Sequence, residues 1–179
     1  LVFIDDNIAG NRRYAKELFA RLKPLKKQWA SQASMTLTRD PELLRLAAES
    51  GCVSLFIGVE SLSSENLKDV NKSFNQIHQL EEAMRAVHDH DIMVLAGFIF
   101  GLDHDDEGVF ERTLRFCERN RIELPSFFLL TPLPGTALFQ RMESEDRLLH
   151  QDWGQYNGAT VVFKPRLMTE ETLQRGFNW

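Results

Sequence analysis

The sequence has few cysteines, and this limits the kinds of site it can build. Only two of its 179 residues are cysteines, Cys52 and Cys117, and they lie far apart without metal-ligand spacing. This pattern is typical of two buried thiols in a reducing compartment rather than of a disulfide. We therefore expect a cytoplasmic protein whose own cysteines bind no metal.

Long apolar runs and an excess of positive charge are also missing. The longest apolar stretch, residues 92–100, is far shorter than the roughly 18 residues that a membrane span needs. No signal-peptide pattern opens the chain. The 26 acidic residues outnumber the 21 basic ones, which gives a formal net charge of -5 and disfavours nucleic-acid binding. We expect a small-molecule substrate, with neither nucleic acid nor membrane as a partner.

Several well-known catalytic motifs are absent. The sequence contains no nucleophile elbow, no phosphate-binding glycine loop and no dinucleotide fingerprint. Of its five histidines, only His104 follows a predicted strand. A hydrolase with a histidine-built metal centre is therefore disfavoured, because such a centre needs several histidines at strand ends.

What the sequence does contain is an alternation of short apolar runs and amphipathic helical patterns. Each apolar run is short enough for a strand and ends in polar or glycine residues, which predicts parallel strands delivering a site to one end of a sheet. The fold class predicted is α/β, a partial TIM-type (βα) barrel with helices outside, because about five βα units fall short of eight. The five predicted strands are residues 1–4, 29–35, 55–59, 92–100 and 126–130.

Local signals predict where the helices begin and end. Asp40 and Pro41 should open one helix that Gly51 closes, and Thr136 and Thr169 should each cap another. Asn75 and one of Asp105 or Asp106 should cap two more, whereas residues 63–73 indicate a polar turn. Beyond residue 143 the rhythm breaks down, so we expect residues 1–143 to form the barrel core and residues 144–179 an extension packed on it.

The strand ends carry the candidate site residues. Glu60 directly follows a buried run, where an unpaired carboxylate would be costly, so a site role or a salt bridge, for example to Lys72, is expected. The series Asp5, Asp6 and Asn7 fits either a cation or polar substrate, or the turn chemistry that precedes a helix.

Two glycines fall on one face of the fourth predicted strand. Gly97, Ile99 and Gly101 alternate with Phe98 and Phe100, so the glycines share a face. Glycine weakens a strand, and two on one face indicate close approach by a ligand or by another part of the chain. A floor for a flat ligand such as adenine and simple helix packing both remain open.

Five segments in order resemble the radical S-adenosylmethionine (SAM) superfamily, and more narrowly its cobalamin-associated branch of anaerobic cyclases and methyltransferases. They are FIDDN (3–7), SQASM (31–35), LFIGVES (55–61), GFIFGLD (97–103) and LLTPLPGT (129–136), with DW (152–153) and VVFKP (161–165) fitting the tail. The resemblance covers nearly the whole chain. It implies a 4Fe-4S cluster and SAM as cofactors, and cobalamin in this branch.

In such enzymes the reduced cluster cleaves SAM to a radical that abstracts a substrate hydrogen. The resemblance implies that Glu60 and Ser61 contact the ribose or methionine part of SAM, and that Lys72 meets its carboxylate. A polar pocket from Asp5, Asp6, Asn7, Asp103 and His104 is expected beside it. The SAM-binding residues that the resemblance implies are Gln32, Ser34, Glu60, Ser61, Lys72, Gly97, Ile99 and Thr131.

The sequence departs from this family at two places. The cluster-binding CxxxCxxC loop is absent and is expected upstream of Leu1, so no metal ligand is assigned within the chain. His104 stands where the family often has an acidic residue. We therefore expect the whole protein to be a radical SAM enzyme, of methyl-transfer or cyclisation type, that uses a reductant protein. The chain alone is expected to be inactive, and its catalytic residues and substrate are unknown.

Two other function classes remain open from the residues themselves. One is a metal-dependent (βα)-barrel lyase or aldolase using Asp5, Asp6, Glu60 and Asp103, and the other is a non-catalytic α/β binding module. Residues 1–4 should present a bare strand edge, a template for another strand. We expect self-association through that edge, or its cover by residues 161–163.

Overall fold

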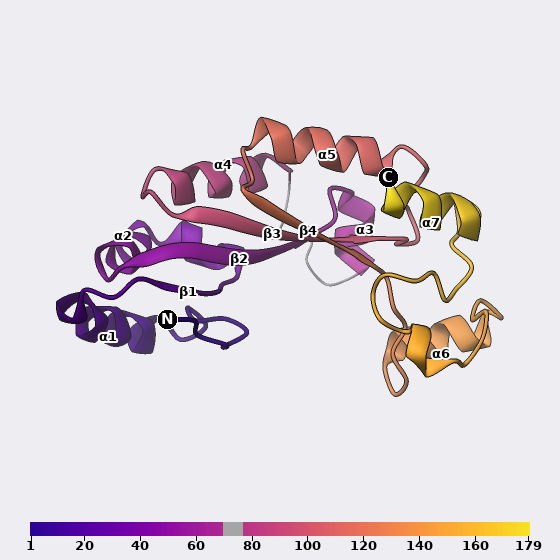
Figure 1. Cartoon of the computed structure of the whole chain (residues 1–179), viewed down its shortest axis with the longest axis horizontal. Coiled ribbons are helices and arrows are strands. Elements are labelled where there is room, and N and C mark those ends of the chain that lie inside the picture. The colour runs from indigo at the N-terminus through magenta and orange to yellow at the C-terminus, as the bar shows by residue number, and fades with distance from the viewer. Residues whose placement is uncertain (70–76) are drawn as a thin grey trace. The chain divides into compact units, whose positions relative to one another are not determined.

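The computed structural model describes residues 1–69 and 77–179, and its helices and strands alternate along the chain (Figure 1). The strands are β1 (Trp29–Gln32), β2 (Cys52–Glu60), β3 (Met93–Phe100) and β4 (Leu124–Leu129). The α-helices are α1 (Arg12–Leu22), α2 (Pro41–Glu49), α3 (Ser64–Asp69), α4 (Ile77–His88), α5 (Val109–Arg119), α6 (Ala137–Ser144) and α7 (Glu170–Asn178). Three 3₁₀ turns are η1 (Lys23–Leu25), η2 (Met35–Arg39) and η3 (Trp153–Gln155).

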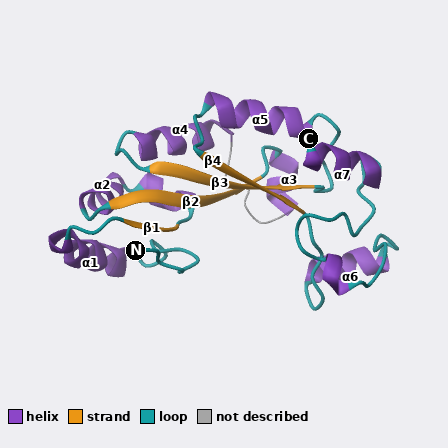
Figure 2. Cartoon of the chain, in the orientation of Figure 1, coloured by secondary structure: helices purple, strands orange, loops and turns teal. Residues whose placement is uncertain are grey.

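The four strands form one parallel sheet in the order β1-β2-β3-β4 (Figure 2). This confirms the predicted α/β class with parallel strands. The register of β1 against β2 pairs Ser31 with Leu55 and Gln32 with Phe56. The expected strand at residues 1–4 reduces to a single parallel bridge between Val2 and Ala30, so the sheet has four strands among the described residues rather than five.

Most of the predicted helix signals act as expected. Asp40 accepts a hydrogen bond from the Leu43 N–H at 3.1 Å and Pro41 opens α2, whereas Gly51 ends it with a φ of +97°. Thr136 and Thr169 accept from backbone N–H groups in the first turns of α6 and α7. The expected cap Asn75 lies outside the described residues.

Three local predictions are wrong for identifiable reasons. The expected turn at residues 63–73 contains α3, because Ser63 Oγ accepts from the Asn66 N–H at 3.3 Å and starts a helix. The expected strand 29–35 ends early because Met35 begins η2. The expected cap by Asp105 or Asp106 is not formed in the first turn of α5: Asp105 accepts from the N–H groups of Gly101 and Leu102, and Asp106 accepts from that of Gly108, which precedes the helix.

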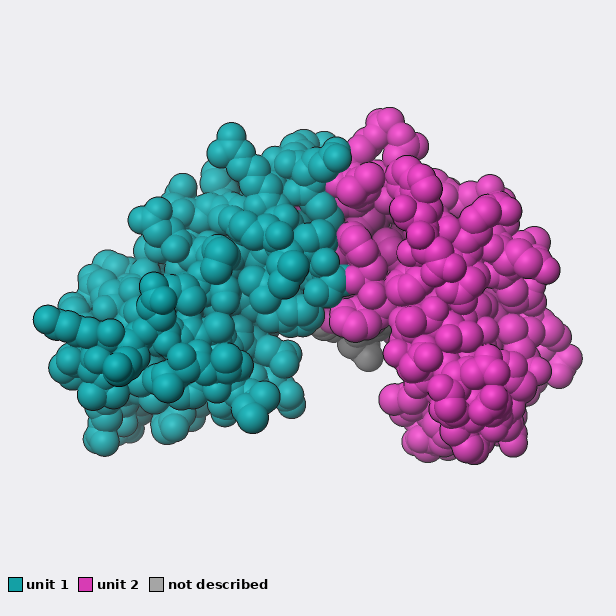
Figure 3. All heavy atoms as spheres, in the orientation of Figure 1, with its two compact units in different colours: residues 1–59, 74–97, 117–126 teal, residues 60–73, 98–116, 127–179 magenta. Residues whose placement is uncertain are grey.

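The chain forms two compact units, coloured separately in Figure 3. Among described residues, the first contains 1–59, 77–97 and 117–126, and the second contains 60–69, 98–116 and 127–179. In the first unit Phe19 stacks on Trp29 with ring centroids 5.2 Å apart, and the Trp29 Nε1–H donates to Ser50. This buries a large ring without leaving its polar atom unpaired.

The second unit has its own core. Phe100 at the end of β3 packs there with Val162, Phe163 and Leu173, which come from residues 144–179. Those residues therefore supply a large part of this core. In residues 1–69 and 77–179 no helix is long and apolar enough to span a membrane.

Candidate functional site

Strand β2 ends at Glu60, whose backbone lies in the left-handed region with a φ of +68°. This conformation is uncommon for a residue other than glycine and is often found at functional sites. Ser61 follows and is buried, with its hydroxyl oxygen accepting from the Ser63 N–H at 3.1 Å. The chain thus turns sharply where the sequence predicts the site.

A buried amide joins the loop after β2 to the loop after β3. Asn66 is fully buried; its Nδ2 donates to Asp105 Oδ1 at 2.7 Å and to Ser61 Oγ at 3.3 Å. Its Oδ1 accepts from the His104 N–H at 2.9 Å. Every polar atom of this side chain is therefore used to hold Ser61 and His104 in place.

Asp105 is the acceptor in this arrangement, and its second oxygen binds the turn after β3. Oδ2 accepts from the N–H of Gly101 at 2.9 Å and of Leu102 at 3.0 Å. Burial raises the pKa of Asp105 to about 6, although the hydrogen bonds from Leu102, Gly101 and Asn66 act in the opposite direction. The carboxyl group is thus a buried anchor for residues 101–105.

Three arginines converge on Asp103. Its Oδ1 lies 2.9 Å from Arg147 Nη1, and its Oδ2 lies 3.1 Å from both Arg141 Nη2 and Arg166 Nε. Glu145 contacts Arg147 at 3.1 Å and Arg166 at 2.9 Å. Three guanidinium groups therefore face two carboxylates, which leaves one positive charge in excess.

Part of this cluster is buried without hydrogen bonds. The side chains of Asp103 and Arg147 are each 9% exposed. Within residues 1–69 and 77–179, neither Asp103 Oδ1 nor Arg147 Nη2 has a hydrogen-bond partner. Asp103 Oδ1 instead forms an ion pair with Arg147 Nη1 at 2.9 Å. The two side chains are thus held as a largely buried ion pair.

A cavity of about 310 Å³ opens beside Asp103 within the second unit. His104 lies near its polar rim, with Nε2 3.3 Å from Asp69 Oδ2. The cavity is lined on its apolar side by Leu102, Leu130, Ala137 and Leu138, and on its polar side by Asn66, Asp69, Asp103 and Arg141. A mainly apolar wall with a few polar groups is typical of small-molecule sites.

In the first unit the structure brings Asn7 and Ser34 together. Asn7 Oδ1 accepts from the N–H of Ser34 at 3.2 Å and of Ala9 at 3.3 Å, and its Nδ2 donates to Ser34 Oγ at 3.2 Å. Asn7 thus performs the turn chemistry that was the alternative to a ligand role. Gln32, at the end of β1, is exposed, as are Asp5 and Asp6.

The residues predicted to line the adenine of SAM make contacts within the protein itself. A Cβ at Gly97 would lie 2.8 Å from Phe56 Cζ, so the glycine makes room for that ring. Ile99 packs against the core of the second unit, and Thr131 Oγ1 donates to the Leu129 carbonyl at 3.0 Å. Packing of the Phe56 ring from β2 therefore accounts for Gly97, and its adenine contact stays a prediction.

The predicted SAM residues are divided between the two units, so their meeting at one site stays a prediction. Gln32, Ser34 and Gly97 belong to the first unit, and Lys72 lies outside the described residues. Those in the second unit are Glu60, Ser61, Ile99 and Thr131, together with Asp103 and His104 of the predicted polar pocket.

The cysteines do not fit a 4Fe-4S cluster. Cys52 opens β2, away from the carboxyl ends of the strands, and Cys117 lies in α5; both are buried and free. Burial raises the pKa of Cys52 to about 12 and of Cys117 to about 11, whereas a metal ligand must be a thiolate. Two such thiols cannot supply the three ligands of a SAM-binding cluster, so these residues do not hold it.

The described residues also offer no other preformed metal centre. Within residues 1–69 and 77–179, no three His, Cys, Asp or Glu side chains are grouped so that they could hold an ion. The metal-dependent lyase alternative, built on Asp5, Asp6, Glu60 and Asp103, therefore receives no support from the geometry.

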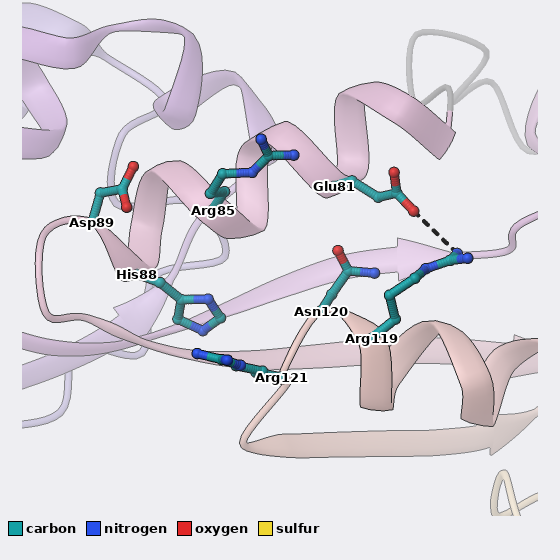
Figure 4. Close-up of a pocket in the computed structure, with 7 residues that line it drawn as sticks. All are labelled: Glu81, Arg85, His88, Asp89, Arg119, Asn120 and Arg121. Atoms are coloured by element: carbon teal, nitrogen blue, oxygen red, sulfur yellow. Dashed lines mark ion pairs between the residues drawn. The ribbon is translucent and has the colours of Figure 1, made fainter.

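A larger hollow, of about 520 Å³, lies in the first unit and contains none of the predicted site residues. Figure 4 shows it at the ends of α4 and α5, with Arg119 Nη2 3.0 Å from Glu81 Oε1. Arg85, His88 and Arg119 lie in the last turns of these helices, where positive charge favours the helix dipole. The favourable interaction of positive charge with the helix C-termini accounts for the presence of these three side chains at the hollow.

Sequence reasoning missed Asn66 and the three arginines around Asp103. No spacing in the sequence links Arg141, Arg147 and Arg166 to residue 103 or to one another. Asn66 lies in a stretch predicted to be a turn, so its burial could not be read from the pattern. Of the residues around the cavity beside Asp103 that have no predicted site role, only Asp105 was marked in the sequence, because it belongs to the acidic run after β3.

The sequence matches known proteins over nearly its full length. The family model described as the Radical SAM superfamily matches residues 2–117. The bacteriochlorophyllide d C-12(1)-methyltransferase of Chlorobaculum tepidum is 39% identical over 98% of this chain and 38% of its own length. The hopanoid C-2 methylase of Rhodopseudomonas palustris is 34% identical over 84% of this chain and 30% of its own length.

A solved structure shares the fold. The radical S-adenosylmethionine methyltransferase TsrM from Kitasatospora setae, solved with cobalamin and a [4Fe-4S] cluster bound, aligns with a TM-score of 0.71 at 14% identity. The alignment covers 99% of this chain and 38% of TsrM. The chain thus spans well under half the length of the relatives it matches.

Proposed function

Because the chain belongs to the radical SAM superfamily, we propose that the whole protein is a radical SAM enzyme that methylates an organic acceptor. The observation that carries this proposal is the family match over residues 2–117, which includes the ends of β1, β2 and β3. The 39% identity to a methyltransferase over 98% of the chain favours methyl transfer over cyclisation.

The family's cofactors are SAM and a 4Fe-4S cluster, and when bound they supply one-electron cleavage of SAM. The cluster ligands lie outside this chain, since Cys52 and Cys117 do not fit. The task of the chain is then to bind and orient SAM and the acceptor. Glu60, with its left-handed backbone at the end of β2, is proposed to accept hydroxyl or amino groups of SAM. Gln32 and Ser34 stay predicted SAM-binding residues of the first unit.

For the acceptor we propose a tetrapyrrole, because the methyltransferase from Chlorobaculum tepidum acts, by its name, on bacteriochlorophyllide d.

We also propose a reductant protein as partner and a cytoplasmic location, which suits the two free thiols. Cobalamin stays a prediction, checked by the visible absorption of the purified full-length protein.

The test uses the full-length protein, reconstituted anaerobically with iron and sulfide and given SAM and dithionite. We expect a brown iron-sulfur chromophore and the release of 5′-deoxyadenosine or S-adenosylhomocysteine. If neither product forms although the chromophore is present, the proposed function is wrong.

A charge-removing variant tests the role of Glu60 in the same assay. Glu60→Gln keeps the shape of the side chain but replaces a charge-assisted hydrogen bond by a neutral one, which costs about tenfold or more in SAM turnover. Glu65→Gln is the matched control, since Glu65 is exposed on α3 and binds Ser63 and Ser64. Equal turnover in the two variants would contradict the assignment.

A further inference from the structure

We infer that the cavity beside Asp103 binds a carboxylate arm of the acceptor and that Arg141 is the residue that pairs with it. This inference rests on the proposed function, because it assigns part of the acceptor to a place in the second unit. This cavity has a volume of about 310 Å³, and its lining includes Leu102, Leu130, Asp103 and Arg141.

Arg141 presents an accessible guanidinium to the cavity. It lies on α6, whose start is fixed by Thr136 Oγ1 accepting from the Phe139 N–H at 3.2 Å. One of its nitrogens, Nη2, lies 3.1 Å from Asp103 Oδ2, and the side chain is 43% exposed. A guanidinium has five N–H donors, so most of them remain available to a ligand.

The charge around Asp103 favours an anion. Arg147 and Arg166 already flank this carboxylate at 2.9 and 3.1 Å, and Glu145 is the second acid of the cluster. Three positive groups against two negative ones leave Arg141 only partly neutralised. Asp103, Arg147 and Arg166 are thus positioning residues that hold Arg141 at the cavity, and an incoming carboxylate removes the surplus charge.

The rest of the lining limits what kind of ligand fits. Asp103 is not available to a cationic ligand because it already faces three guanidinium groups, and Asp69 Oδ2 lies 3.3 Å from His104 Nε2. The wall formed by Leu102, Leu130 and Leu138 suits an apolar arm. The fork of Arg141 matches a planar carboxylate in two-point contact. The cavity lies at the small end of ligand sites and so takes an arm rather than a whole ring system.

The test compares two forms of one probe on the reconstituted full-length protein. Pheophorbide a, a chlorin with one free propionic acid, and its methyl ester differ in the charge of that arm alone. We expect the acid to bind the unaltered protein about tenfold more tightly than the ester, measured by quenching of protein fluorescence. This preference should vanish in Arg141→Gln and survive partly in Arg141→Lys.

Arg112→Gln is the matched control, because Arg112 also pairs with an aspartate, Asp106 at 2.8 Å, is 55% exposed and does not line the cavity. It should keep the full preference for the acid. Equal binding of acid and ester, failure of both to bind, or a preference that persists in Arg141→Gln overturns the inference. SAM cleavage without acceptor, measured on the same samples, reports on the proposed function separately, since it needs no bound chlorin.

Discussion

At the scale of single residues, the buried carboxylate of Asp105 holds the loop of residues 101–105 after β3 in place. The group accepts three hydrogen bonds, from Gly101, Leu102 and Asn66. Burial raises its pKa to about 6, above the value of 3.8 for an ordinary aspartate. The folded protein therefore holds the proton over a pH range in which the unfolded chain has released it.

This difference predicts an unusual pH dependence. Between about pH 4 and pH 6 the folded state binds more protons at Asp105 than the unfolded state, so the free energy of unfolding falls as pH rises. The loss is on the order of 3 kcal/mol and is complete above the folded pKa. Urea unfolding of the unaltered protein and of Asp105→Asn at several pH values measures it.

The variant removes the titrating group but keeps its shape. Asp105→Asn should be less stable by about 1–3 kcal/mol at pH 4, because its amide faces the Nδ2 of Asn66, donor against donor. The difference between the two proteins should shrink as pH rises to 6. A constant difference across this range would show that Asp105 does not titrate there.

At the scale of elements, the C-terminal helix α7 closes the core of the second unit. Leu173 of α7 is fully buried, and a Cβ at Gly101 would lie 2.9 Å from both Leu173 and Phe163. On the same helix, a Cβ at Gly176 would overlap the ring of Phe110. Two glycines, one after β3 and one in α7, thus allow the helix to pack directly against the end of the sheet.

Gly176→Ala tests this close packing. Alanine normally favours a helix over glycine by up to about 1 kcal/mol, but here its methyl group must displace Phe110, which costs about 1–3 kcal/mol. We expect a net loss in the free energy of unfolding, measured by urea denaturation. Gly154→Ala is the control, because its Cβ would meet only Asp152 Oδ1, at 3.4 Å. Equal stability of the two variants would mean that α7 can shift without cost.

At the scale of the whole molecule, the chain carries a family fold without the ligands of the family's cluster. Both cysteines are buried, with thiol pKa values of about 12 and 11. Residues 1–179 alone should therefore develop no iron-sulfur chromophore after anaerobic reconstitution. Their thiols should react with a disulfide reagent at pH 8 only after denaturation. A stable brown chromophore in this chain would overturn the assignment of cluster ligands to other residues.

The edge of the sheet near the N-terminus predicts association of the chain when it is expressed alone. Leu1, Val2 and Ile4 are 63%, 76% and 88% exposed, and an uncovered apolar edge is a template for another strand. Light scattering of residues 1–179 should show self-association that Ile4→Lys reduces, since a charge at an edge opposes pairing. A monomer at all concentrations would contradict this.

The sequence alone determined the features that depend on near neighbours. The alternation of strands and helices follows from hydrophobic period, and the helix starts at Asp40, Thr136 and Thr169 follow from side chains that reach the next turn. The strand-end position of Glu60 was predictable for the same reason, because a strand is short and its end is marked by the change from apolar to polar residues.

Only the tertiary structure decided which distant groups meet. Asn66 and Asp105 are 39 positions apart, and the arginines at 141, 147 and 166 reach Asp103 from α6 and the segments that follow it. Packing also decided that Gly97 makes room for Phe56. Such contacts depend on how loops close over long separations, and hydrophobic period and capping carry no information about that. The order of the strands could therefore be predicted from the sequence, whereas the cavity beside Asp103 and the position of Arg141 in its lining could not.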